Sequence, residues 1–125
     1  MSIVFSFLLV VFFQGIAFSQ PSIQFDSERY DFGKVSGSVR VLEHVFMVTN
    51  VGDKDLIIEQ LVPSWSGSSA EMASLSRLKP GEQGQIIARL HIQEGLRGQI
   101  SKWVKVFSND PKRPVILLIM FAKIL

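Results

Sequence analysis

Apolar and polar residues alternate over much of the chain after residue 20, in short runs separated by turn-forming residues. In the run 85–92 every second residue is apolar, namely Ile86, Ala88, Leu90 and Ile92. A period of two is the pattern of a half-buried β-strand. Six further runs fit strands, over residues 22–25, 30–32, 39–49, 55–62, 99–107 and 114–124.

Strong turn signals separate several of these runs. The segments 50–53, 79–81 and 109–111 combine Asn, Asp, Pro and Gly, the residues that favour tight turns. Helical periodicity is nearly absent, although residues 71–78 could hold one short helical turn. About seven short strands with this spacing predict an all-β fold, an immunoglobulin-like β-sandwich.

The N-terminal segment differs from the rest of the chain. Residues 3–18 are almost entirely apolar and end in Ala17-Phe18-Ser19, whose small residues suit signal peptidase. We therefore expect residues 1–19 to be a signal peptide and residues 20–125 to form one domain. A non-cleaved anchor is the alternative, but the run is shorter than the roughly 20 residues that span a bilayer comfortably.

Charge and cysteine content exclude several classes of function. The formal net charge is +2 and the basic residues are scattered, so nothing favours nucleic acid as a partner. The chain has no cysteine. Disulfides, thiolate zinc sites, iron–sulfur clusters, cysteine nucleophiles and lipid attachment at a cysteine are therefore excluded.

Four phrases occur together in a recognisable order. They are YDFGKV at 30–35, HVFMVTNVGDKDLII at 44–58, LKPGEQGQI at 78–86 and VKVFSNDPKRPVILL at 104–118. In this order they resemble an uncharacterised family of exported bacterial immunoglobulin-like domains, related to the ASH/Hydin and PapD-like modules. The resemblance covers residues 22–124 and implies a fold and an exported location, but no active site.

Residues in these phrases also have physical interpretations of their own. Phe46 and Val48 would point into the sandwich. Asn50 and Gly52 would turn the corner after this strand with positive φ angles. The Asn-Asp pair at 109–110 would bond to its own backbone and so close a turn.

The loop 63–68 departs from the family pattern. Many sequences of this kind carry Cys-Gly-Cys after the strand that ends in LVP, whereas this chain has Pro-Ser-Trp-Ser-Gly-Ser. An exposed tryptophan among Ser and Gly is typical of adaptable contact surfaces. We therefore predict a partner contact formed by Trp65, Ser64, Ser66 and Ser68. In the alternative, another loop covers Trp65 and the side chain serves the fold.

No catalytic, metal or cofactor site is predicted. His44 and His91 are the only histidines, and both fall within strand runs. The serines of the loop lack the Gly-x-Ser-x-Gly elbow of α/β-hydrolases. Carboxylates near the histidines do not show metal-ligand spacing.

The function expected from the sequence is therefore non-enzymatic. We expect a periplasmic or secreted module with a binding or structural role in the cell envelope, which contacts an unknown protein or envelope component through end loops or a sheet edge. The alternative is a periplasmic chaperone-like module that pairs its edge strand with a client protein. After cleavage we expect no stable membrane span and no nucleic-acid partner.

Signal-peptide cleavage has a direct test. N-terminal sequencing of the protein isolated from its native host should identify Gln20 as the first residue. Recovery of a chain that begins at Met1 in the membrane fraction would support the anchor instead.

Overall fold

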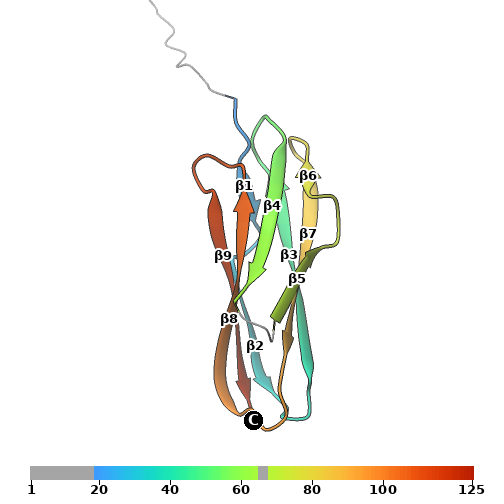
Figure 1. Ribbon diagram of the computed structural model, residues 1–125, viewed down its shortest axis with the longest axis vertical. Coiled ribbons are helices and arrows are strands. Elements are labelled where there is room, and N and C mark those ends of the chain that lie inside the picture. Colours follow the sequence, from blue (N-terminus) through green and yellow to red (C-terminus); the bar gives the residue numbers. More distant parts are fainter. Residues whose placement is uncertain (1–18, 65–67) are drawn as a thin grey trace, which may run out of the picture.

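Two β-sheets face each other in the computed structural model, which describes residues 19–64 and 68–125 (Figure 1). One sheet has the spatial order β1 (Ile23–Phe25), β3 (Val41–Asn50), β7 (Gln83–His91), β5 (Ser68–Met72). The other has the order β2 (Arg29–Val35), β9 (Val115–Ile124), β8 (Gly98–Ser108), β4 (Leu56–Pro63), β6 (Arg77–Leu78). The predicted all-β, immunoglobulin-like sandwich is confirmed, and the described residues contain no helix able to cross a membrane.

The core lies between the sheets and follows the alternation of the sequence. Every second residue of β7 is buried, and the same holds for the central part of β9. Phe46 and Val48 are fully buried, so their predicted inward direction is confirmed. The fully buried side chains come from both sheets and include Phe46, Leu56, Leu78, Ile86, Leu90, Leu118 and Met120.

The beginning of the domain contributes a strand to each sheet. β1 pairs antiparallel with β3, and β2 then crosses over and pairs parallel with β9. The pairing of β2 shifts register between Asp31 and Lys34, and Gly33 in this bulge has a φ of 73°. The sequence predicted the end of the strand at Gly33, but the bulge lets the strand continue to Val35.

Residues 71–78 do not form the helical turn that their sequence allowed. They belong instead to β5, β6 and the connection between these strands. Ala70 and Met72 pack against the core, and Leu78 is buried. The polar and small residues around β5 show no clear alternation of apolar and polar positions. The local sequence therefore does not specify a strand, and packing against the core determines the structure of this segment.

Gly52 is required for close packing and not for a special φ angle. Neither Asn50 nor Gly52 has a positive φ, so this prediction was wrong. A Cβ atom on Gly52 would overlap the carbonyl oxygen of Gln20, because the start of the domain passes directly over this turn.

Phe46→Ala tests the packing of the core. Because Phe46 is fully buried, the substitution should lower the free energy of unfolding by about 3–5 kcal/mol, as measured by denaturant titration. Val51→Ala is the matched control, since Val51 is exposed and should cost under about 0.5 kcal/mol. A small loss for Phe46→Ala would contradict the inward direction of this residue.

Candidate functional site

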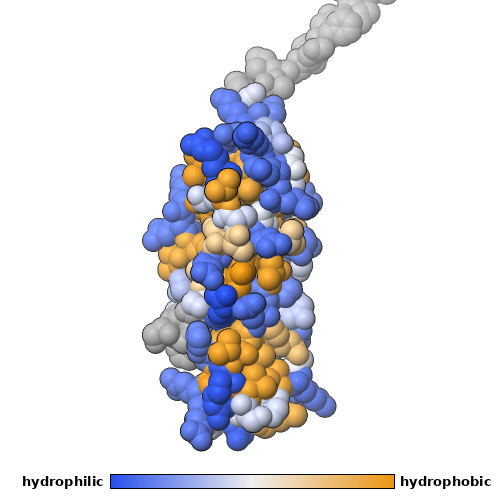
Figure 2. Space-filling model, turned by 90° about the vertical axis from the view of Figure 1, so that its right-hand side faces the viewer, coloured by the Kyte–Doolittle hydropathy of each residue, from blue (hydrophilic) through white to orange (hydrophobic). Residues whose placement is uncertain are grey.

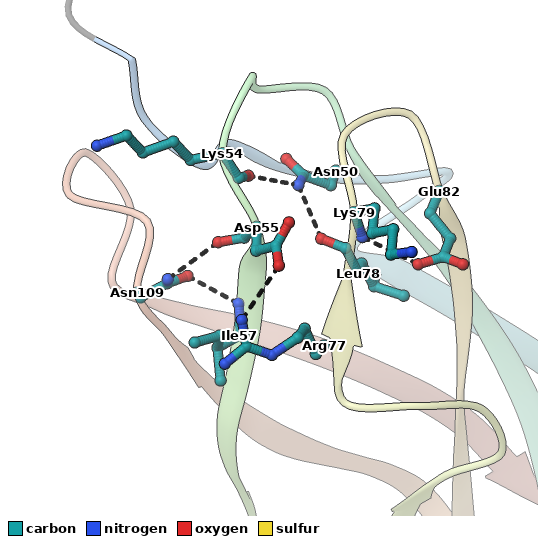
Figure 3. A network of polar contacts seen from close by, with 9 residues as sticks. All are labelled: Asn50, Lys54, Asp55, Ile57, Arg77, Leu78, Lys79, Glu82 and Asn109. Carbon is teal, nitrogen blue, oxygen red and sulfur yellow. Dashed lines mark hydrogen bonds and ion pairs between the residues drawn. The ribbon is translucent and has the colours of Figure 1, made fainter.

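Three turns meet at one end of the sandwich, and they include residues from three of the four phrases (Figure 3). Asn50 lies at the centre and is fully buried. Its Nδ2 donates to the carbonyl oxygens of Lys54 (2.7 Å) and Leu78 (3.0 Å). Its Oδ1 accepts from the backbone N–H groups of Ser22 (3.3 Å) and Gly52 (3.0 Å). The amide thus joins the turn after β3 to β6 and to the start of the domain.

Asn109 joins the turn after β8 to the start of β4. Its Oδ1 accepts from the backbone N–H of Ile57 at 2.8 Å, and its Nδ2 donates to the carbonyl oxygen of Asp55 at 3.1 Å (Figure 3). The sequence predicted that Asn109 would bond within its own turn, and this was wrong. The side chain reaches a strand more than 50 positions away because the fold places these two turns side by side.

Asp110 closes its own turn, as predicted, and also reaches β1. Its carboxylate accepts from the backbone N–H groups of Lys112 (2.7 Å), Arg113 (3.1 Å) and Ile23 (2.9 Å). Burial by itself would raise the pKa of Asp110. The three backbone donors and the Arg113 guanidinium outweigh burial, so the pKa of this carboxyl is lowered.

The side chains of this polar end join separate segments of the fold. They bond mainly to backbone groups, and among the described residues every buried side-chain nitrogen or oxygen has a hydrogen-bond partner. None of the bonds joins a nucleophile to a base, which catalysis by an activated hydroxyl would require.

The two histidines lie on opposite faces of the same sheet. His44 is half-buried and stacks on Tyr30, with ring centroids 3.7 Å apart. Burial lowers the pKa of His44, although the nearby Asp26 partly opposes the shift. His91 is exposed on the outer face, where its strand neighbour Arg89 also lies. Within the described ranges, no three His, Cys, Asp or Glu side chains are grouped so as to hold a metal ion.

The predicted contact loop is described only at its borders. Ser64 donates its backbone N–H to the carbonyl oxygen of Trp103 at 2.9 Å, and its hydroxyl accepts from the Trp103 N–H at 3.3 Å. Ser64 therefore fastens the end of β4 to β8. Trp65 and Ser66 lie outside the described residues. Ser68 begins β5, and its backbone is in register with Leu90 of β7.

β5 forms a free edge directly after this loop. Ala73 N–H donates to the carbonyl oxygen of Gln85 at 2.9 Å, in the register that also pairs Glu71 with Ile87. Because hydrogen-bonded pairs alternate along an antiparallel ladder, the backbone N–H and C=O groups of Ala70 and Met72 point away from β7. β5 is the last strand of its sheet, so these groups face outward.

The other edge strands carry features that hinder pairing with another chain. β1 has three residues and β6 has two, and β2 is interrupted by its bulge at Gly33. Short strands and bulges are common protections of sheet edges. The five residues of β5 are in unbroken register and contain neither Pro nor Lys.

Ion pairs hold β5 on its sheet. Arg89 of β7 bonds to Glu71 of β5 at 2.7 Å and to Glu43 of β3 at 2.8 Å. All three side chains lie on the outer face of the four-stranded sheet and are partly exposed. Each pair therefore contributes little to stability, but together they fix the position of the edge strand.

A family described as "Protein of unknown function (DUF1573)" matches residues 23–121. The chain belongs to this family. The predicted resemblance to an uncharacterised immunoglobulin-like family is thereby confirmed, and no curated protein matches the chain.

Several solved structures are similar to this DUF1573 chain. One is a protein of unknown function from Porphyromonas gingivalis W83, with a TM-score of 0.73 and 19% identity. The match covers 89% of this chain and 50% of that one. PapD-like domain 7 of human CEP192 has a TM-score of 0.58 and 11% identity, and the match covers 100% of this chain and 96% of that one. The Escherichia coli chaperone DraB has a TM-score of 0.57 and 12% identity over 82% of this chain and 54% of that one. This chain thus spans only half of the Porphyromonas protein, and identities this low establish the fold alone.

The sequence pattern predicts a contact at the loop, but it does not indicate the edge strand that follows. The segment 68–72 alternates only weakly, and no residue in it is strongly apolar apart from Met72. One indirect indication of a strand was present in the sequence. The segment after the loop is too short for a stable helix, which leaves a strand as the regular structure that it could form.

Asp110→Asn tests the electrostatic part of the polar end. A lowered pKa in the folded state means that the carboxylate stabilises the protein above its unfolded pKa of about 3.9, and that this contribution is lost as the pH falls through the folded pKa. At pH 7 the variant should lose about 1–3 kcal/mol of unfolding free energy, and its stability should fall less on acidification to pH 3 than that of the wild type.

Asp55→Asn is the control, because Asp55 forms an exposed pair with Arg77 at 3.1 Å. It should cost under about 1 kcal/mol. Equal pH profiles for wild type and Asp110→Asn would contradict the role assigned to Asp110.

Proposed function

We propose that this DUF1573 chain is an exported, non-enzymatic module that binds a protein or another component of the cell envelope. The contact is made by the free edge of β5 and the loop 64–68 before it. The observation that carries this proposal is the unbroken, outward-facing backbone of β5 at Ala70 and Met72. Such an edge accepts an extended segment of a partner as an additional strand.

The surroundings of β5 favour a partner with alternating apolar residues. A strand added beside β5 would direct every second side chain toward the seam between the two sheets. Ala70, Met72 and Leu61 are half-buried hydrophobic residues that pack against the core near this seam. Apolar side chains of the partner would extend this packing, while the main-chain bonds supply affinity that does not depend on sequence.

Trp65 extends the proposed contact beyond the strand. It lies three residues before β5 in the sequence, within the loop that replaces Cys-Gly-Cys. An indole ring offers a large apolar area and one hydrogen-bond donor, which is why tryptophan is frequent among the residues that dominate binding.

The start of the domain supports the proposed cleavage after Ser19. The backbone nitrogen of Gln20 lies 2.8 Å from Asp53 Oδ1, and the Asp53 N–H donates to the carbonyl oxygen of Gln20 at 3.1 Å. Cleavage would convert this nitrogen into an ammonium group that faces a carboxylate, which makes the hydrogen bond stronger.

A chaperone-like function is the second candidate, favoured by the similarity to solved chaperones such as DraB. In this chain β9 has β2 on one side and β8 on the other, so the last strand has no free edge. A client strand would therefore pair with β5. A chaperone should suppress the aggregation of many unfolded proteins, whereas a binding module should retain few and defined partners.

Ala70→Pro tests the edge. The N–H of Ala70 is not needed by β7, so proline at this position should cost at most about 1–2 kcal/mol of stability while it removes an outward donor and blocks strand addition. Capture of partners from the native envelope fraction, followed by mass spectrometry, should fall at least tenfold. If the chaperone function is correct, the Ala70→Pro variant should also lose at least tenfold of its ability to suppress the aggregation of an unfolded test protein.

Two variants serve as comparisons for Ala70→Pro. Ala70→Ser keeps the N–H and should bind like the wild type. Trp65→Ala should weaken binding by roughly 2 kcal/mol with a nearly unchanged melting temperature. Undiminished capture by a folded Ala70→Pro variant would exclude the β5 edge as the contact.

A further inference from the structure

The outer faces of the two sheets differ in chemistry. On the four-stranded sheet, apolar residues are interrupted by polar ones, as Figure 2 shows for the side where β5 and β7 lie. Arg89 and its two glutamates occupy this face together with Thr49, Gln83 and Gln85. This is the ordinary surface of a sheet with one solvated face.

The outer face of the five-stranded sheet is apolar along β9. Val115 and Leu117 are exposed by 46% and 41%, and Ile119 and Phe121 are half-buried. In the next strand, Phe107 is opposite Val115 and Trp103 is opposite Ile119. These six residues are called the apolar face below. A strand that is apolar on both sides is typical of a sheet covered on both sides.

Cationic side chains border the apolar face on both sides of β9. Lys105 of β8 is opposite Leu117, and its Nζ lies 5.2 Å from the centroid of the Trp103 ring. Arg29 of β2 is opposite Ile119, and its guanidinium carbon lies 5.3 Å from the centroid of the Phe121 ring.

A cavity of about 260 Å³ adjoins this face beside the bulge of β2. Its lining includes Phe121, Lys34 and Lys123, together with Asp31. The carboxylate of Asp31 accepts from the Gly33 N–H at 2.8 Å, and Glu28 near the other end of β2 binds Arg113 at 2.8 Å. Asp31 and Glu28 are thus each bonded within this chain, and the lining of the cavity also carries Lys34 and Lys123.

A second copy of the chain is a poor occupant of this face. Face-to-face packing of two copies would bring Arg29, Lys105 and their neighbours against equivalent cations. Close like charges are unfavourable where water is excluded. An occupant that complements the face needs an apolar centre and negative flanks.

We propose that the apolar face binds an amphipathic helix of a partner protein, whose apolar stripe is flanked by Asp and Glu. From Val115 to Phe121 the strand extends over roughly 20 Å. A helix of about 13 residues has the same length. Its stripe would cover β9, and its acidic flanks would meet Lys105 on one side and Arg29 and Lys34 on the other. This surface is distinct from the β5 edge and does not depend on the function proposed for it.

Two synthetic peptides test the inference on the purified chain as processed by its host. Both are 14-residue helix-forming peptides with the same leucine stripe, flanked by Glu in one and by Lys in the other. The Glu peptide should bind at least tenfold more tightly, as measured by calorimetry in low salt, and should change the fluorescence of the protein. Equal affinities, or no binding of the Glu peptide at millimolar concentration, would overturn the proposal.

Variants locate the binding site. Leu117→Ser should weaken binding of the Glu peptide at least tenfold. Lys105→Glu should reduce the preference for the Glu peptide over the Lys peptide, because one of the two cationic flanks is then acidic. Ile87→Ser is the matched control on the other sheet and should leave both affinities unchanged. A loss of binding by Ile87→Ser, with none for Leu117→Ser, would refute the site. In sedimentation experiments without peptide, the chain should be a monomer. A dimer that Leu117→Ser dissociates would instead assign the apolar face to a second copy of the chain.

Discussion

The sandwich depends on one buried side-chain amide at the point where the chain leaves one sheet for the other. Asn50 ends β3, and β4 begins the opposite sheet six residues later. Its Oδ1 and Nδ2 bond to backbone groups of four residues, which come from the start of the domain, the turn itself and β6. An apolar residue of similar size would leave these backbone groups unsatisfied in the interior, at about 1–3 kcal/mol for each one that water cannot reach. Asn50 thus fixes the corner at which the chain leaves β3, directly before β4 begins in the opposite sheet.

The fold could be predicted from the sequence because the long strands alternate clearly, and β7 shows why. Ile86, Ala88 and Leu90 are buried, as their period of two indicates. The turns were predictable only in their positions. Asn109 bonds across to β4, and Gly52 serves close packing; both roles depend on segments distant in the sequence. Local patterns do not contain such information.

The candidate site could be predicted only in part, for a related reason. Loop 64–68 is marked by an unusual composition, so its position could be inferred. The free edge of β5 could not, because an edge is a property of the strand order in space. The apolar side chains of β9 were visible as a run without alternation, yet the run alone does not tell whether the second face is buried by the fold itself. In the structure Val115 and Leu117 of this second face are exposed, so the fold itself does not bury it.

The two proposed surfaces belong to different sheets, and this separation has a consequence for mechanism. A strand added at β5 would extend the four-stranded sheet at its edge, whereas a helix on β9 would lie flat on the opposite sheet. Neither occupant would need the backbone groups or side chains that the other uses, so both could be bound together. The chain has no cysteine and so no disulfide to stiffen it. Its two sheets are linked through the packed core and through the buried bonds of Asn50 to Leu78 and of Asp110 to Ile23. With both proposed contacts formed, the sandwich would hold two partners at a distance set by its own dimensions, a structural role that requires no chemistry of its own.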